Sequence, residues 1–135
     1  MKTVFLDSSV FFSAVNSPSG GSAKLFTIKD LKLVTSSLVL AEVERNVYRK
    51  LTDIHLERFF MLTAQVKIYS QEPDNRLIAN AKKVIVEKDA FILAEAKQSK
   101  ARYIVTLDKK HFFTTDASTF VKPQKIMTPK MIIAL

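Results

Sequence analysis

Four carboxylates in this sequence could bind divalent cations if the fold brings them together: Asp7, Glu42, Asp89 and Asp108. Several carboxylates within a few ångströms cannot all stay ionised without a cation, because like charges raise each other's pKa. Oxygen ligands in a chain that has no cysteine favour Mg²⁺ or Mn²⁺ over zinc. Two such ions about 4 Å apart could hold a phosphodiester, activate water for in-line attack and stabilise the departing oxygen. This chemistry needs no histidine, and the two histidines, His55 and His111, lack the H-x-x-x-H spacing of a metal site.

Asp7 and Asp108 each follow a short apolar segment that is typical of a strand, at residues 3–6 and 103–107. Ligand sites in α/β sheets lie beyond the carboxyl ends of the strands, so both acids stand where a site is expected. Side chains alternate along a strand, which predicts that the hydroxyl of Thr106 shares a face with Asp108. An equally simple interpretation is that each Asp caps the helix that follows it.

Asp89 lies on the apolar face of its predicted helix, residues 88–99. At 100° per residue it lies beside Leu93, while Glu95 and Gln98 point the other way. A carboxylate directed at the core is costly unless it is paired, hydrogen-bonded or bound to a metal. Its position in the first turn offers some relief through the helix dipole. Some other group must therefore compensate Asp89.

Glu42 lies opposite the apolar stripe of the helix predicted at residues 38–51, which is centred near Val43. This position suits a carboxylate that faces a polar cleft. It suits an exposed contact with Arg45 or Arg49 equally well, because both arginines share the same helix face. The residues alone favour the surface contact.

The elements that must position these acids alternate between strands and helices, which predicts an α/β fold with a parallel sheet covered on both faces. No repeat or linker divides the chain, so residues 1–135 are expected to form one domain. Strands are expected at residues 3–6, 31–35, 66–69, 103–107 and 124–127, and helices at 8–15, 22–29, 38–51, 53–65, 75–86, 88–99 and from 129 onward.

Composition and charge point to a cytoplasmic protein with a polyanionic partner. The chain has 47% hydrophobic and 25% charged residues, no cysteine, and no apolar run long enough to cross a membrane. Its beginning is not that of a secretory signal, because Asp7 interrupts the early apolar run. The net charge is +8, which attracts nucleic acid, although a merely well-solvated basic surface gives the same count.

Four segments of the chain resemble the four motifs of the PIN-domain family, in order and at similar spacing. VFLDSSV at residues 4–10 is similar to the opening strand with the first acid, and SSLVLAEV at 36–43 to the serine-led helix with the second. KDAFILAEA at 88–96 resembles the third motif, in which an Asp opens an alanine-rich helix. IVTLDKKHF at 104–112 resembles the fourth, a strand that ends in Thr-x-Asp before a basic, aromatic tail.

The resemblance implies a three-layer α/β/α, PIN-like (Rossmann-like) fold with a central, mainly parallel sheet of four to five strands. It implies that Asp7, Glu42, Asp89 and Asp108 are metal ligands for Mg²⁺ or Mn²⁺ and catalyse the cleavage of single-stranded RNA. Ser8 and Thr106 are then candidates for positioning water or metal. In such families the protein is often the toxin of a toxin–antitoxin pair, which implies a cognate antitoxin as partner, and often a homodimer.

Basic residues near the acids are the candidates for gripping RNA. Lys109 and Lys110 follow Asp108 and could hold phosphates on either side of the scissile one, or could be solvated surface lysines. Arg45 and Arg49, on the helix face of Glu42, are similar candidates.

One residue departs from the family pattern. The family commonly has Gly between the Thr and Asp of the fourth motif, where this chain has Leu107, and a different turn there would affect the metal contact of Asp108. Two other functions agree with the same fold. One is a PIN-fold module that holds RNA or a protein without cutting, and the other is a structure-specific DNA nuclease.

Overall fold

The computed structural model describes residues 1–135 and contains one five-stranded sheet in the order β3-β2-β1-β4-β5. All four strand pairs are parallel, which confirms the α/β fold expected from the sequence. The strands are β1 (Lys2–Leu6), β2 (Leu31–Ser36), β3 (Lys67–Tyr69), β4 (Tyr103–Val105) and β5 (Lys125–Met127).

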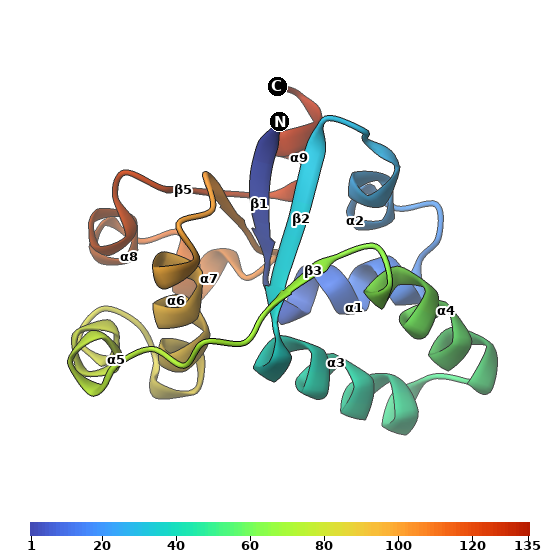
Figure 1. Ribbon diagram of the computed structural model, residues 1–135, viewed down its shortest axis with the longest axis horizontal. Helices are drawn as coiled ribbons and strands as arrows, with labels where there is room; N and C mark the ends of the chain where they lie inside the picture. The colour runs from blue at the N-terminus through green and yellow to red at the C-terminus, as the bar shows by residue number, and fades with distance from the viewer.

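Helices cover both faces of the sheet and make three layers (Figure 1). One side carries α1 (Ser8–Asn16), α2 (Gly21–Lys24), α3 (Ser37–Lys50) and α4 (Asp53–Thr63), and the other carries α5 (Asn75–Lys82), α6 (Glu87–Ser99) and α8 (Thr115–Val121). The remaining helices are the single turn α7 (Lys109–Phe112) and the terminal α9 (Pro129–Ile133). No helix is both long enough and apolar enough to span a membrane.

Apolar residues on both faces of the central strands hold the layers together. Val4, Phe5 and Leu6 of β1 have no exposed surface, and Ile104 and Val105 of β4 are buried beside them. This near-continuous apolar pattern is typical of a strand with helices on both sides. These residues of β1 and β4 belong to a hydrophobic cluster of 32 buried residues, and β1 is the middle strand of the sheet.

Helix ends and strand ends depart from the sequence-based bounds where a side-chain hydroxyl takes a backbone partner. The helix expected at 22–29 is only the four-residue α2 followed by the 3-10 turn η1 (Leu25–Thr27). The hydroxyl of Thr27 donates to the carbonyl of Lys24 at 2.7 Å, at the point where the α-helix ends. Likewise β4 ends two residues earlier than expected, because the amide of Leu107 donates to the Ser9 hydroxyl instead of a neighbouring strand.

Glu95 was expected on the outer face of its helix, and this expectation is wrong. The residue is only 4% exposed, because α6 packs between the sheet, through β2, and α5. A helix covered on two sides buries residues that lie opposite its main apolar stripe.

The carboxyl ends of three adjacent strands meet at one edge of the sheet. Leu6 at the end of β1 pairs with Val105 at the end of β4, and Phe5 pairs with Val34 near the end of β2. The segments that follow these strands are therefore neighbours in space although they are far apart in sequence. This edge is where a parallel sheet places its ligand sites.

Candidate active site

The four acids picked out from the sequence line one cavity of about 210 Å³ at the carboxyl edge of the sheet. Each comes from a different element: Asp7 joins β1 to α1, Glu42 lies in α3, Asp89 in the first turn of α6, and Asp108 directly before α7. The rest of the lining consists of Ser8, Ser9, Phe12, Asn46, Lys88 and Ile92.

Asp7 is only 5% exposed and is held in place by two hydroxyls. Thr106 Oγ1 and Ser9 Oγ both donate to its Oδ2, at 2.8 and 2.9 Å. It precedes α1 but makes no side-chain capping bond, so the helix-cap interpretation does not hold for this residue. Burial raises the pKa of Asp7, and the hydrogen bonds from Thr106 and Ser9 partly offset this rise.

The hydroxyl of Thr106 donates a hydrogen bond to Asp7. The sequence had predicted that this hydroxyl shares a strand face with Asp108, and that prediction is wrong. β4 has already ended at Val105, so strand alternation does not extend to Asp108. The Thr106 hydroxyl instead accepts a hydrogen bond of 3.0 Å from the backbone amide of Asp108 while donating to Asp7. One hydroxyl thus fixes both the first carboxylate and the turn that carries the fourth.

Asp89 carries a buried oxygen, Oδ2, that has no hydrogen-bond partner. The Nδ1 atom of His111 lies 4.0 Å from this oxygen. Burial raises the pKa of Asp89, and the negative charge of Asp7 raises it further. No protein group therefore donates a hydrogen bond to this oxygen, which leaves it open to a ligand.

Asp108 does cap the helix that follows it, because its Oδ1 accepts from the backbone amide of His111 at 3.1 Å. Its other oxygen lies 2.8 Å from Nδ1 of the same histidine. Burial alone would raise the pKa of Asp108, but the hydrogen bonds and charge of His111 outweigh it, and the pKa lies below its usual range. The carboxylate of Asp108 thus both caps α7 and lines the cavity.

His111 was set aside in the sequence for lacking a second histidine at metal-ligand spacing. In the structure its ring nitrogen and carboxylate oxygens of Asp89 and Asp108 all lie within 4.8 Å of one another, close enough to share one ion. The feature of the sequence that could have identified His111 is its i, i+3 spacing from Asp108, which puts both side chains on one side of α7.

Glu42 faces the cavity, and the surface contact favoured by the residues alone is wrong. It makes no ion pair with Arg45 or Arg49. Its Oε2 instead accepts a hydrogen bond of 3.2 Å from the hydroxyl of Ser8, and the residue is half-buried. The reason is tertiary, because α1 packs against α3 on this side and covers what would otherwise be an exposed face.

The donor set of the cavity fits a hard divalent cation. Four carboxylates supply oxygen ligands, His111 adds an imidazole nitrogen at one side, and no thiolate is present to favour a softer metal. The buried, unpartnered Oδ2 of Asp89 is an acceptor that a cation would satisfy.

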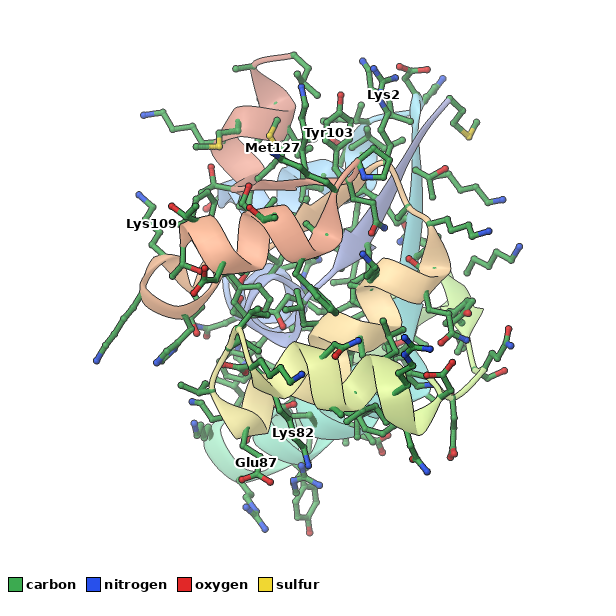
Figure 2. All side chains as sticks on the ribbon, turned by 90° about the vertical axis from the view of Figure 1, so that its left-hand side faces the viewer. Lys2, Lys82, Glu87, Tyr103, Lys109 and Met127 are labelled. Atoms are coloured by element: carbon green, nitrogen blue, oxygen red, sulfur yellow. The ribbon has the colours of Figure 1, made fainter.

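The basic residues proposed from the sequence are placed unequally around the acids. Arg45 and Arg49 are exposed on α3 and do not line the cavity, whereas Asn46 and Lys88, which the sequence reasoning missed, do. Lys110 is exposed. Lys109 lines a neighbouring cavity and lies on the outside of the molecule, as Figure 2 shows.

Leu107, which stands where the family commonly has Gly, fits the turn without strain. The only non-glycine residue with a positive φ is Lys100, so position 107 does not need the conformational freedom of glycine. The side chain is 44% exposed and points away from the core. The departure from the family pattern therefore does not remove Asp108 from the cavity.

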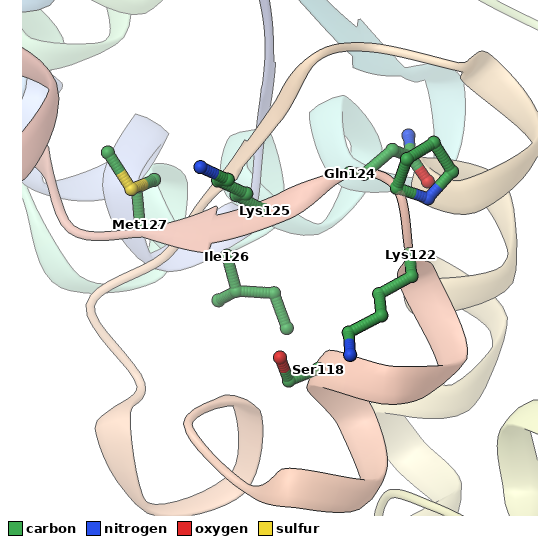
Figure 3. A pocket seen from close by; sticks show the side chains of 7 residues that line it. Ser118, Lys122, Gln124, Lys125, Ile126 and Met127 are labelled. Atoms are coloured by element: carbon green, nitrogen blue, oxygen red, sulfur yellow. The ribbon is translucent and has the colours of Figure 1, made fainter.

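A larger cavity of about 650 Å³ lies between α8 and the edge strand β5 (Figure 3). It is lined by Ser118, Lys122, Pro123, Gln124, Lys125, Ile126 and Met127. It holds no carboxylate and no histidine, so it offers neither metal ligands nor an acid–base pair. Size alone therefore does not locate the chemistry of this protein.

The fold is similar to those of several solved toxin–antitoxin proteins, at low sequence identity. VapBC2 from Rickettsia felis, bound to a DNA fragment from its promoter, aligns with a TM-score of 0.68 and 16% identity over 93% of this chain and 98% of that one. DNA-bound VapBC from Salmonella typhimurium gives 0.68 and 13% over 96% and 99%. VapC20 from Mycobacterium tuberculosis, a sarcin-ricin loop cleaving toxin, gives 0.53 and 17% over 79% and 91%.

No curated protein sequence matches this chain. The family model for the PIN domain, however, matches residues 4–117, which include all four acids of the cavity. Together with the parallel sheet and the shared fold, this match confirms the resemblance inferred from the four motifs. The chain belongs to the PIN domain family.

Proposed function

We propose that this protein is a metal-dependent endoribonuclease that cleaves single-stranded RNA, and that it acts as the toxin of a toxin–antitoxin pair. The single observation that carries the proposal is the cavity at the sheet edge. Four carboxylates line it, and one of them, Asp89, has a buried oxygen with no partner in the protein. Such a cluster is unfavourable without a cation and well suited to one.

Asp7, Glu42, Asp89 and Asp108 would hold the cations, Mg²⁺ or Mn²⁺. When bound, such cations supply the positive charge that orients a phosphodiester, lowers the pKa of water and stabilises the departing oxygen. The protein groups around the acids keep them in position: Thr106 and Ser9 donate to Asp7, and Ser8 donates to Glu42. Lys88 at the cavity wall is placed to attract the phosphate backbone.

The toxin role is supported by the kind of protein to which the fold is similar. Two are VapBC complexes solved with DNA, and a third is described as a toxin that cleaves the sarcin-ricin loop. We propose by the same analogy that a cognate antitoxin binds this protein. The net charge of +8 is consistent with an RNA substrate.

The test is cleavage of a fluorescent single-stranded RNA by the purified protein with Mg²⁺, with Mn²⁺ and with EDTA. We expect cleavage with either metal, loss of cleavage with EDTA, and loss in Asp7→Asn and Asp89→Asn. Asp116→Asn, an exposed acid on α8, is the matched control and should cut like the wild type. Binding without cleavage under both metals would favour the non-catalytic module, and cleavage of the corresponding DNA but not RNA would favour a DNA nuclease.

A further inference from the structure

A further cavity of about 290 Å³, here called the second cavity, lies across the turn that carries Asp108 from the acidic cavity. Leu107 and Lys109 line this second cavity, while Asp108 between them lines the acidic one. The complete lining is Ser13, Gly21, Ser22, Leu107, Lys109, Thr128, Pro129 and Lys130.

The charge of the second cavity is opposite to that of the first. Its lining contains two lysines and no acid. Neither lysine forms an ion pair, since those of the structure join Lys2 to Asp30, Lys82 to Glu87, and His111 to two acids of the first cavity. Two unpaired ammonium groups at one cavity make it attractive to an anion.

One hydroxyl in the second cavity has no hydrogen-bond partner in the protein. Ser22 is only 4% exposed, and its side chain makes no hydrogen bond in the structure. Unlike the buried oxygens of Asp89 and Glu95, the oxygen of Ser22 keeps contact with solvent, so the hydroxyl can donate to a ligand or to water in the cavity. Ser13 adds a second hydroxyl, and Thr128 Oγ1, which accepts from the amide of Met131 at 3.2 Å, keeps its own proton to donate.

The acidic cavity and the second cavity lie about one helical turn apart along α1. Ser9 lines the acidic cavity and Ser13 the second one, four residues further along the helix. Four residues of an α-helix advance by about 6 Å. Successive phosphates of a stacked strand are about 3.4 Å apart along its axis, so about 6 Å corresponds to one or two nucleotides.

We infer that the second cavity is a phosphate subsite. It holds a phosphate of the RNA strand one or two nucleotides from the phosphodiester in the acidic cavity, through Lys109, Lys130 and the Ser22 hydroxyl. This inference rests on the proposed function for the identity of the strand. Because the subsite lies beside the acids, it requires at least one nucleotide on that side of the cut.

The test measures binding apart from cleavage. Anisotropy of a labelled single-stranded RNA is followed in EDTA at several KCl concentrations for wild type, Lys130→Gln, Ser22→Ala and the control Lys125→Gln. Lys125 is an exposed lysine on β5 that lines the larger cavity beside α8 but neither the acidic cavity nor the second one. We expect Lys130→Gln to weaken binding by about threefold to tenfold and to reduce the slope of log affinity against log salt by about 0.7, the value for one phosphate contact on a single strand.

Ser22→Ala should weaken binding without changing the salt slope, because it removes a neutral hydrogen-bond donor. Lys125→Gln should change neither quantity. Equal salt slopes for Lys130→Gln and Lys125→Gln would overturn the subsite, even if the wild type cleaves RNA with Mg²⁺. A reduced slope for Lys130→Gln alone would support it, even if no cleavage is found. Thermal melts of the variants confirm that each is folded.

Discussion

The hydroxyl of Thr106 donates a hydrogen bond of 2.8 Å to Oδ2 of Asp7, across 99 positions of sequence. Both residues directly follow the paired ends of β4 and β1, so the sheet register itself sets this contact. The same hydroxyl accepts from the amide of Asp108. The side chain of Thr106 therefore links two of the four acids, through the carboxylate of Asp7 and the backbone amide of Asp108.

Replacing Thr106 by Val keeps the shape of the side chain and removes its hydrogen bonds to Asp7, to the amide of Asp108 and to Ser9. The variant is expected to be less stable by about 1–3 kcal/mol, because the buried carboxylate of Asp7 loses one of its two hydroxyl donors and the backbone amide of Asp108 loses its acceptor. Loss of a positioned ligand should also lower kcat more than it raises KM. Denaturant melts and RNA-cleavage kinetics measure the two effects. Thr119→Val, an exposed threonine on α8, is the control, and equal behaviour of the two variants would refute the link.

Metal binding should stabilise the protein through the unpartnered oxygen of Asp89. A ligand that binds only the folded state at 100 times its Kd adds about 2.7 kcal/mol, so Mg²⁺ should raise the Tm of the wild type. Asp89→Asn should already be at least as stable as the wild type without metal, because a repelling buried charge is gone. It should then gain little from Mg²⁺. A Tm that responds equally to Mg²⁺ in both proteins, followed by calorimetry, would contradict this role.

Glu95 should make the stability of the protein fall as the pH rises. Burial raises the pKa of this carboxyl above its ordinary value of 4.5, and its Oε1 has no partner. The folded state then binds the proton more strongly than the unfolded chain, so stability is present below about pH 4.5 and is lost as pH rises through the folded-state value.

Glu95→Gln keeps the shape of the side chain and removes its charge. We expect it to be more stable than the wild type near pH 7 and similar to it at pH 4, measured as Tm across this range. A difference that is the same at both pH values would show that the charge of Glu95 is not responsible.

His111 should raise the affinity of the site for metal, because its Nδ1 lies 2.8 Å from Oδ2 of Asp108 and holds this carboxylate in position at the cavity. His111→Gln is therefore expected to require more Mg²⁺ for half-maximal cleavage. The other histidine supplies the control: His55 hydrogen-bonds to Thr52 at the start of α4, outside the cavity, so His55→Gln should leave the Mg²⁺ requirement unchanged. Equal requirements in the two variants would exclude a role for His111 in the site.

Local pattern was sufficient for the fold and for most of the acids. The apolar runs before Asp7 and Asp108 predicted buried strands, and parallel strands necessarily bring their carboxyl ends to one edge. The apolar neighbours of Asp89 predicted a carboxylate turned toward the interior, and its oxygen is buried. These features depend on residues within one element, where the periods of helix and strand decide which way a side chain points.

The serine and histidine partners of the acids could not be read in the same way. Ser8 was chosen from the sequence, yet Ser9 contacts Asp7 while Ser8 contacts Glu42. Periodicity does not separate the two serines, because the distinction depends on how α1 lies against β4 and α3. His111 likewise became relevant only when α6 and α7 brought Asp89 and Asp108 together.

By itself, the sequence determined the parallel sheet and the family, because each depends on hydrophobic period and on short motifs, but it did not predict α8 (Thr115–Val121). The tertiary structure alone decided the direction of Glu42 and the burial of Glu95. The physical reason is the same for both: a helix has one period but several neighbours, and its exposed face is whatever those neighbours leave uncovered. For Glu42 the neighbour is α1, and for Glu95 the neighbours are β2 and α5.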